Sequence, residues 1–135
     1  MSARDQRGFT LIELMIVVVI IGVFAAIFIP SFVAMQDRVR EASVKSNGHT
    51  VQLAVEDYAV QNNGVYPYSK LAWAQIVANL PGGEVVRNPF SGEKGLTVGV
   101  GAAEGMVDYT LPVDGVYIIT CYGESGVNIL TLTNG

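Results

Sequence analysis

The sequence predicts an α+β protein in which one long amino-terminal α-helix, first apolar and then amphipathic, packs on a small antiparallel β-sheet. Two observations support this prediction. Residues 1–35 hold 24 of the 68 residues of the AVILMFWYC set in this 135-residue chain. Three strand-like runs separated by turns then follow between residues 106 and 133. The length suits one globular head, and the apolar excess is confined to the arm that precedes it.

The apolar arm is long enough to cross a membrane. Between Glu13 and Asp37 lie 23 residues without a formal charge, which as a helix extend about 35 Å. Arg4 and Arg7 precede this run, and the next basic residue is Arg38. This charge distribution predicts an amino terminus on the cytoplasmic side. We therefore expect a transmembrane and assembly helix over 9–35 and a globular head with its stem over 36–135.

The order of parts differs from that of a secretory signal peptide. Such a peptide has an apolar region of about 7 to 15 residues, followed by a small residue at the cleavage site. In this chain the run is longer, and the small residue, Gly8, lies before it. The sequence therefore predicts cleavage after Gly8, with residues 1–8 as a leader.

Glu13 is a carboxylate inside the apolar arm. Such a charge costs a few kcal/mol unless it meets a partner, and no Lys, Arg or His lies between Arg7 and Arg38. One interpretation is that Glu13 reaches the nearby lipid headgroups. The other is an ion pair with the α-amino group that cleavage after Gly8 would create on Phe9 of a neighbouring copy.

The stretch RGFTLIELMIVVVIIGVFAAIFIPSF resembles the amino terminus of type IV pilins and type II secretion pseudopilins, the class III prepilin pattern. The resemblance implies cleavage between Gly8 and Phe9 by a prepilin peptidase and N-methylation of Phe9. It also implies polymerisation with the arms in the filament core, where Glu13 pairs with the amino terminus of an adjacent subunit.

The same resemblance places Gly22 and Pro30 where such arms bend or melt. Proline removes one backbone donor and clashes with the carbonyl four residues earlier. Glycine weakens a helix by about 1 kcal/mol relative to alanine. The alternative is a proline that the membrane helix simply tolerates.

The head shows the periodicities of one helix and several strands. An apolar stripe of helical spacing continues the helix as a stem, which we expect to end at Asn62-Asn63-Gly64. Gly48 is expected to weaken the stem locally. A short helix after Ser69 stops at Pro81. One face of the expected sheet needs cover, which the stem supplies. The stripe consists of Val44, Val51, Ala54, Val55 and Tyr58, and the expected strands are a weak one at 96–100 and three stronger ones at 106–111, 116–122 and 127–133.

Composition argues against several classes of function. The formal net charge of −4 gives no basic field for nucleic acid. One cysteine, Cys121, and one histidine, His49, exclude a disulfide framework and the usual zinc clusters. Asp114 and Glu124 are too few acidic residues for a calcium site. We expect no enzyme activity, no cofactor and no metal, because no nucleophile and base pair stands out.

These observations favour a structural subunit that polymerises through its amino-terminal helix into an extracellular type IV pilus. The expected partners are further copies of the chain, the prepilin peptidase, the inner-membrane pilus assembly machinery and, before assembly, the cytoplasmic membrane. A type II secretion pseudopilin is the alternative within the same resemblance. A membrane-tethered periplasmic ligand-binding module is the alternative from another class, and it gives Glu13 no special role.

Overall fold

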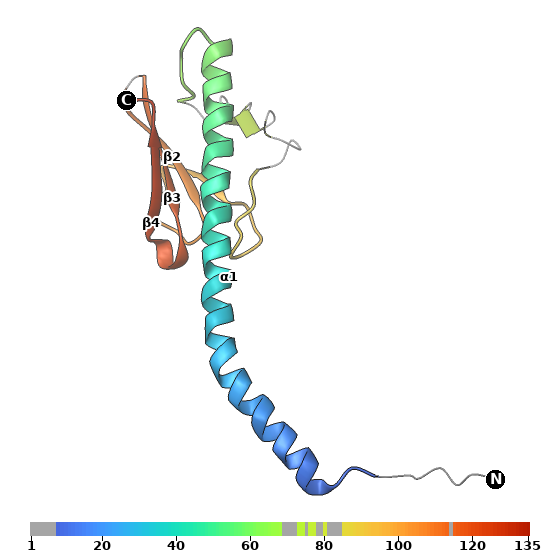
Figure 1. Cartoon of the computed structure of the whole chain (residues 1–135). Helices are drawn as coiled ribbons and strands as arrows, with labels where there is room; N and C mark the ends of the chain where they lie inside the picture. Colours follow the sequence, from blue (N-terminus) through green and yellow to red (C-terminus); the bar gives the residue numbers. More distant parts are fainter. Residues whose placement is uncertain (1–7, 69–72, 75, 78–79, 81–84, 114) are drawn as a thin grey trace, which may run out of the picture. The chain divides into compact units, whose positions relative to one another are not determined.

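The computed structural model describes residues 8–68, 73–74, 76–77, 80, 85–113 and 115–135 (Figure 1). The chain divides into two compact units, residues 1–36 and 37–135, and each is described by itself. Residues 1–7 of the predicted leader, most of the predicted helix after Ser69, and Asp114 lie outside the described residues.

Helix α1 spans Leu11–Gln61 and includes 51 residues. Its part after Gln36, the stem, is amphipathic as the stripe predicts. The stem ends as expected at Asn63 and Gly64, which adopt left-handed φ values of 56° and 83°. The amide of Gly64 donates to the carbonyl of Ala59 at 2.8 Å, which satisfies one of the last free carbonyls of the helix. The buried stem residues follow helical spacing: Val44, Gly48, Val51, Val55 and Ala59.

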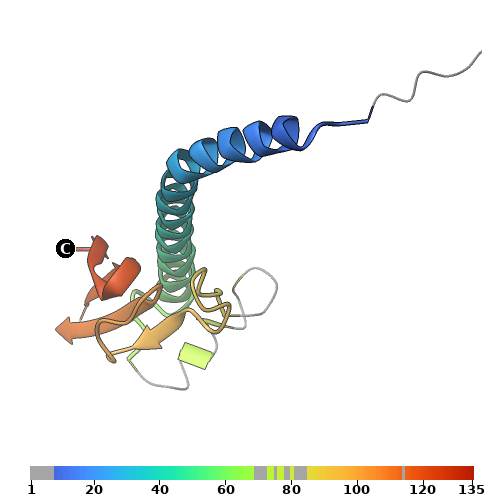
Figure 2. The same cartoon turned by 90° about the horizontal axis from the view of Figure 1, so that it is seen from below.

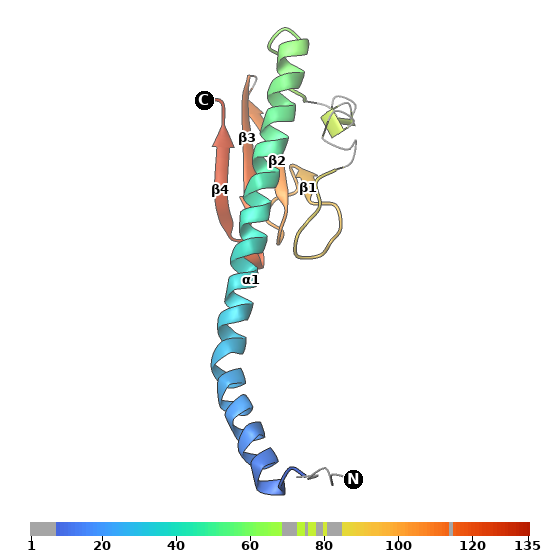
Figure 3. The ribbon, with the colours of Figure 1, turned by 45° about the vertical axis from the view of Figure 1, so that its right-hand side comes forward.

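The sheet has four strands in the order β1-β2-β3-β4 (Figure 3). Strands β2, β3 and β4 form the predicted antiparallel meander. Strand β1 corresponds to the weak strand expected near residue 96, and it pairs with β2 in parallel. Residues 99–106 connect the end of β1 to the start of β2, and in this segment Gly99, Gly101 and Gly105 have positive φ. The bounds are Leu96–Val98 for β1, Val107–Val113 for β2, Val116–Tyr122 for β3 and Asn128–Thr133 for β4, and a short 3₁₀ helix, η2, spans Glu124–Gly126.

The core of the head lies between the stem and one face of the sheet. In β3, buried and partly exposed residues alternate along the whole strand, whereas β2 begins with three buried residues. Figures 1 and 2 show the strands β2 to β4 on one flank of the stem and the yellow segment after residue 85 on the other. The α+β prediction is therefore confirmed. The buried core comprises Val44, Val51, Val55, Ile76, Val107, Tyr109, Tyr117, Ile119 and Cys121.

Aromatic rings connect the sheet to the segment that follows the stem. Trp73 stacks on Tyr109 with 4.8 Å between ring centroids. Tyr109 in turn stacks on Tyr117 at 6.2 Å, and Tyr66 meets Tyr117 edge-on at 5.1 Å. Trp73 is thus a packing anchor of the head, as large apolar side chains at such positions usually are.

Candidate functional site

The candidate site is the beginning of α1. Gly8, Phe9 and Thr10 precede the helix in non-helical conformation. Phe9 is 84% exposed, and no heavy atom lies within 4 Å of the position that a Cβ on Gly8 would occupy. The peptide between Gly8 and Phe9 is thus not enclosed by the described part of the chain.

Thr10 and Glu13 form a reciprocal cap at this end of the helix. The backbone N–H and the hydroxyl of Thr10 both donate to Oε2 of Glu13 at 2.8 Å. The backbone N–H of Glu13 donates to Oγ1 of Thr10 at 3.3 Å. This is the capping box, which satisfies two of the orphan N–H groups of a helix start. This cap was not predicted, although Thr-x-x-Glu directly before an apolar run is its sequence signature.

The cap leaves one oxygen of Glu13 available. Both bonds from Thr10 end on Oε2, and within the described residues Oε1 accepts no hydrogen bond. A carboxylate has acceptor capacity on both oxygens. The site therefore holds a carboxylate in fixed orientation with a free acceptor.

The helix after this cap exposes apolar side chains on all sides. The large apolar residues from Phe9 to Met35 are between 45% and 84% exposed. Among the described residues, α1 is the one helix long and apolar enough to cross a membrane. A soluble protein rarely exposes so large a contiguous apolar surface to water, so lipid or other protein must cover this part of the helix.

Gly22 and Pro30 both lie within the continuous helix α1. A Cβ at Gly22 would meet no heavy atom within 4 Å, so nothing inside the subunit requires glycine there. Phe24 and Phe28 stack along this helix with centroids 6.2 Å apart. Bending or melting at Gly22 and Pro30 stays a prediction about the assembled state.

The head contains polar clusters that sequence reasoning did not find. Asp108 is 4% exposed, and its carboxylate accepts hydrogen bonds from the hydroxyl of Thr97 at 2.9 Å and from the amides of Val100 and Gly101 at 3.2 and 3.1 Å. These bonds hold the glycine-rich segment against β2. No local pattern marks such a contact, because it joins residues that only the tertiary fold brings together.

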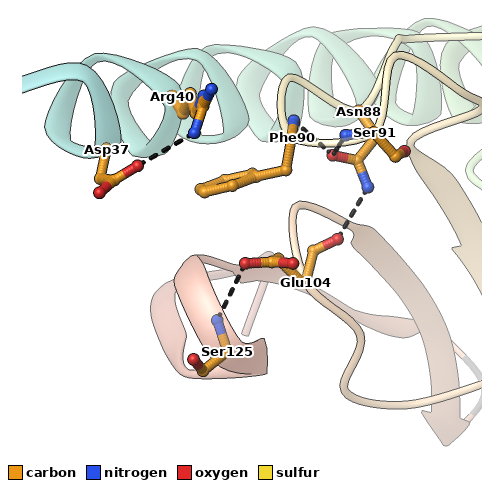
Figure 4. A network of polar contacts seen from close by, with 7 residues as sticks. All are labelled: Asp37, Arg40, Asn88, Phe90, Ser91, Glu104 and Ser125. Atoms are coloured by element: carbon orange, nitrogen blue, oxygen red, sulfur yellow. Dashed lines mark hydrogen bonds and ion pairs between the residues drawn. The ribbon is translucent and has the colours of Figure 1, made fainter. Parts of the chain in front are cut away.

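A second cluster joins the stem to two loops (Figure 4). Asn88, which is 4% exposed, accepts from the amide of Phe90 at 2.8 Å and donates to the carbonyl of Glu104 at 2.7 Å. The carboxylate of Glu104 accepts from the amide of Ser125 at 3.3 Å. Arg40 of the stem lies 5.6 Å from the ring centroid of Phe90. The cluster is structural, because its groups partner one another.

A third cluster attaches β3 to the stem through Tyr117. Its hydroxyl donates to Oε1 of Glu56 at 2.6 Å and accepts from Nε2 of Gln52 at 3.1 Å. Burial, with this bond to Glu56, raises the pKa of Tyr117 to about 12. Burial likewise raises the pKa of Tyr109 and raises that of Cys121 to about 11. A thiol with a raised pKa is a poor nucleophile.

The described part of the head offers no metal centre. Among the described residues, no group of three or more His, Cys, Asp or Glu side chains is placed to hold a metal ion. His49 is exposed on the stem, and Cys121 is a free, buried thiol. Asp114, one of the two acidic residues considered for calcium, lies outside the described residues.

Comparison with known proteins identifies the amino-terminal motif. Residues 3–29 match the prokaryotic N-terminal methylation motif. The chain is 37% identical over 114 residues to the type IV major pilin protein PilE1 of Neisseria gonorrhoeae, a match that covers 82% of this chain and 46% of that protein. This chain is a homologue of the type IV pilins and type II secretion pseudopilins.

Relatives from both branches of the family match at similar identity. The pilin-like chain is 32% identical over 88 residues to the type II secretion system core protein G of Pseudomonas aeruginosa, covering 65% of this chain and 61% of that protein. It is 40% identical over 77 residues to the type IV narrow pilus major component PilA5 of Thermus thermophilus, covering 57% and 62%. The matches thus span less than two thirds of these relatives. No solved structure matches the chain. Members of this family are structural, non-enzymatic proteins.

Proposed function

We propose that this pilin-like chain is the repeating subunit of an extracellular type IV pilus, stored in the inner membrane before it polymerises through α1. The observation that carries the proposal is the combination of an apolar helix exposed on all sides with one fixed carboxylate near its start. Lipid covers that surface before assembly, and the helices of other copies cover it afterwards.

Processing prepares the helix start for assembly. We propose that a prepilin peptidase cleaves between Gly8 and Phe9 and that Phe9 is then N-methylated. This cut leaves the peptide between Phe9 and Thr10 intact, so the N–H that caps Glu13 is retained. The new α-amino group on Phe9 carries a positive charge near neutral pH.

Glu13 then pairs with the amino group of Phe9 on a neighbouring subunit. The cap supports this step, because Thr10 occupies Oε2 and leaves Oε1 for a second donor. Two opposite charges in a low-dielectric interior attract strongly, whereas either one alone is costly there. The pair therefore favours the register in which one subunit's amino end meets the next subunit's Glu13.

The test compares Glu13→Leu with wild type in cells, by measuring membrane-bound subunit and sheared surface filament separately. We expect normal insertion of the variant and a strong loss of filament, because the buried Phe9 cation would lack its partner at a cost of about 3 to 5 kcal/mol. Ile12→Leu, a neighbouring apolar exchange, serves as the matched control and should assemble normally. Normal filament yield from Glu13→Leu would overturn the pairing of Glu13 with Phe9, whereas absence of filaments from the wild type would favour a tethered ligand-binding module, in which Glu13 has no role.

A type II secretion pseudopilin is the second candidate, and the match to core protein G favours it. The two candidates predict different phenotypes for deletion of the gene. Loss of a surface filament whose subunit is identified by mass spectrometry supports the pilus. Loss of secretion of folded extracellular proteins, with surface filaments unchanged, supports the pseudopilus.

A further inference from the structure

The outer edge of β4 has no partner in the described part of the chain. Strand β4 is last in the sheet order and pairs on one side only, with β3. Within the described residues, no backbone hydrogen bond joins Asn128–Thr133 to any segment other than β3. Figure 3 shows β4 at the margin of the sheet, with no ribbon beyond it. An edge strand presents a row of unpaired N–H and C=O groups, which is a template for a further strand.

The two edges of the sheet differ in protection. Strand β1 has only three residues. The segment before it already makes backbone contacts, because the carbonyl of Val86 accepts from the amide of Gly95 at 2.7 Å and Arg87 forms a β-bridge with Lys94. Strand β4 has six residues. Charged residues and proline usually prevent an edge strand from pairing with another chain. The run 127–135, VNILTLTNG, contains neither.

The edge of β4 is also held in place. Asn134 accepts from the amide of Tyr117 at 3.0 Å and donates to the carbonyl of Gly115 at 2.7 Å, which fixes the end of β4 to the start of β3. Leu130 and Leu132 pack against the core. A strand that is already ordered loses little conformational entropy when another strand joins it.

Charge directs a second copy of this chain to that edge, because it is a part of the head where two copies meet without like-charge repulsion. Residues 37–135 carry six basic and ten acidic side chains, so two heads repel on average. The run 127–135 has none of these charges. Two such strands running antiparallel bring no like charges together, and a register centred on Thr131 places this exposed threonine opposite its copy, a cross-strand pair that stabilises sheets.

We propose that the free edge of β4 pairs antiparallel with β4 of a second copy, and that this contact joins neighbouring filaments side by side. An antiparallel pair of identical strands has two-fold symmetry, whereas the contacts that build an open helical filament are heterologous. The β4 pair therefore lies outside the repeating contacts of one filament. The pairing is a property of the head, and only its bundling consequence rests on the proposed filament function.

The pairing itself is tested with the full-length chain in detergent micelles. Thr131→Cys lies near the middle of β4 and next to the two-fold axis of a centred pair. Cross-strand cysteines whose Cα atoms lie about 4.4 to 6.8 Å apart form a disulfide on oxidation. Native Cys121 is 0% exposed, so its background is low. The matched control is Ser43→Cys, which is exposed on the stem.

We expect a disulfide dimer from Thr131→Cys, less dimer from Thr133→Cys, and little from Ser43→Cys. Excess dimer at either β4 position supports the pairing. Equal dimer from Ser43→Cys, or no dimer at β4, overturns it. A cross-link from Thr131→Cys to a different protein in cells also overturns it, because the edge would then accept a foreign strand.

Bundling is tested on sheared filaments by electron microscopy and low-speed sedimentation. Thr131→Lys places like charges across the pair, so we expect normal filament yield with loss of lateral bundles, whereas Ser43→Lys keeps them. Thermal unfolding close to that of wild type checks that Thr131→Lys folds. Unchanged bundles in Thr131→Lys, or wild-type filaments that never associate, overturn the bundling role. Absence of wild-type filaments would defeat the proposed function instead, and the micelle experiment would still decide the pairing.

Discussion

Gly48 of α1 and Cys121 of β3 lie in direct contact, because a Cβ atom added to Gly48 would overlap the sulfur of Cys121. Both residues are buried. Helix propensity alone disfavours glycine at this place in a stem. The close approach of β3 is therefore the reason that the stem has glycine here, and it sets the distance between the stem and the sheet.

Gly48→Ala should destabilise the head. Overpacking a filled core costs about 1 to 3 kcal/mol, which outweighs the gain of about 1 kcal/mol in helix propensity. The measurement is thermal unfolding of the full chain in detergent. In a Cys121→Ala background the sulfur is absent, so the same Gly48→Ala change should be neutral or stabilising. Equal effects of Gly48→Ala in both backgrounds would contradict the contact.

Tyr117→Phe should lower stability by about 1.5 to 3 kcal/mol, the usual worth of a hydrogen bond to a charged group. The change removes the hydroxyl that bridges Glu56 and Gln52. The ring and its stacking on Tyr109 are kept, so the loss reports the polar contact alone. Tyr122→Phe, a change in the same strand, is the control, and it should unfold at nearly the wild-type temperature.

Alkaline pH should unfold the head in one cooperative step. Burial raises the pKa of Tyr117 to about 12 and that of Cys121 to about 11, whereas in an unfolded chain these groups titrate near 10 and 8.5. Their contribution to stability is therefore complete below the unfolded pKa values and is lost as pH rises through the folded ones. The absorbance of the Tyr117 tyrosinate, taken as the difference between wild type and Tyr117→Phe, should rise together with loss of circular dichroism. A separate, earlier titration of Tyr117 in the folded chain would disprove this linkage.

Asp108→Asn should loosen the glycine-rich segment that follows β1. The amide of Val100 donates to Oδ1 and that of Gly101 to Oδ2, and asparagine replaces one of these oxygens with an NH₂ group, which cannot accept a hydrogen bond. We expect a loss of about 1 to 3 kcal/mol and faster hydrogen exchange at whichever of these amides then faces the NH₂ group. Asp57→Asn, an exposed carboxylate on the stem, should change neither quantity.

The stem helix and the strands of the head could be predicted from the sequence, because helices and strands place apolar residues with different periods. The stem stripe from Val44 to Val55 and the alternation in Val116–Tyr122 both gave the observed elements. Asp108 and Asn88 are not readable, because their partners depend on how loops fold back onto the sheet. The cap formed by Thr10 and Glu13 could have been predicted, because its Thr-x-x-Glu pattern is local and is present in the sequence.

Thr10→Ala should fray the first turn of α1, and Thr10→Ser should not. The hydroxyl of Thr10 is the acceptor for the backbone N–H of Glu13, and loss of a capping hydroxyl costs about 1 kcal/mol. Such a loss multiplies local opening by about fivefold. Hydrogen exchange of the Glu13 amide in micelles measures this directly, with the amide of Val33, in the middle of the helix, as internal reference. Serine keeps the oxygen, so its amide should exchange at the wild-type rate. Equal exchange of the Glu13 amide in wild type and Thr10→Ala would mean that the cap does not hold the carboxylate, and the fixed orientation assigned to Glu13 would be wrong.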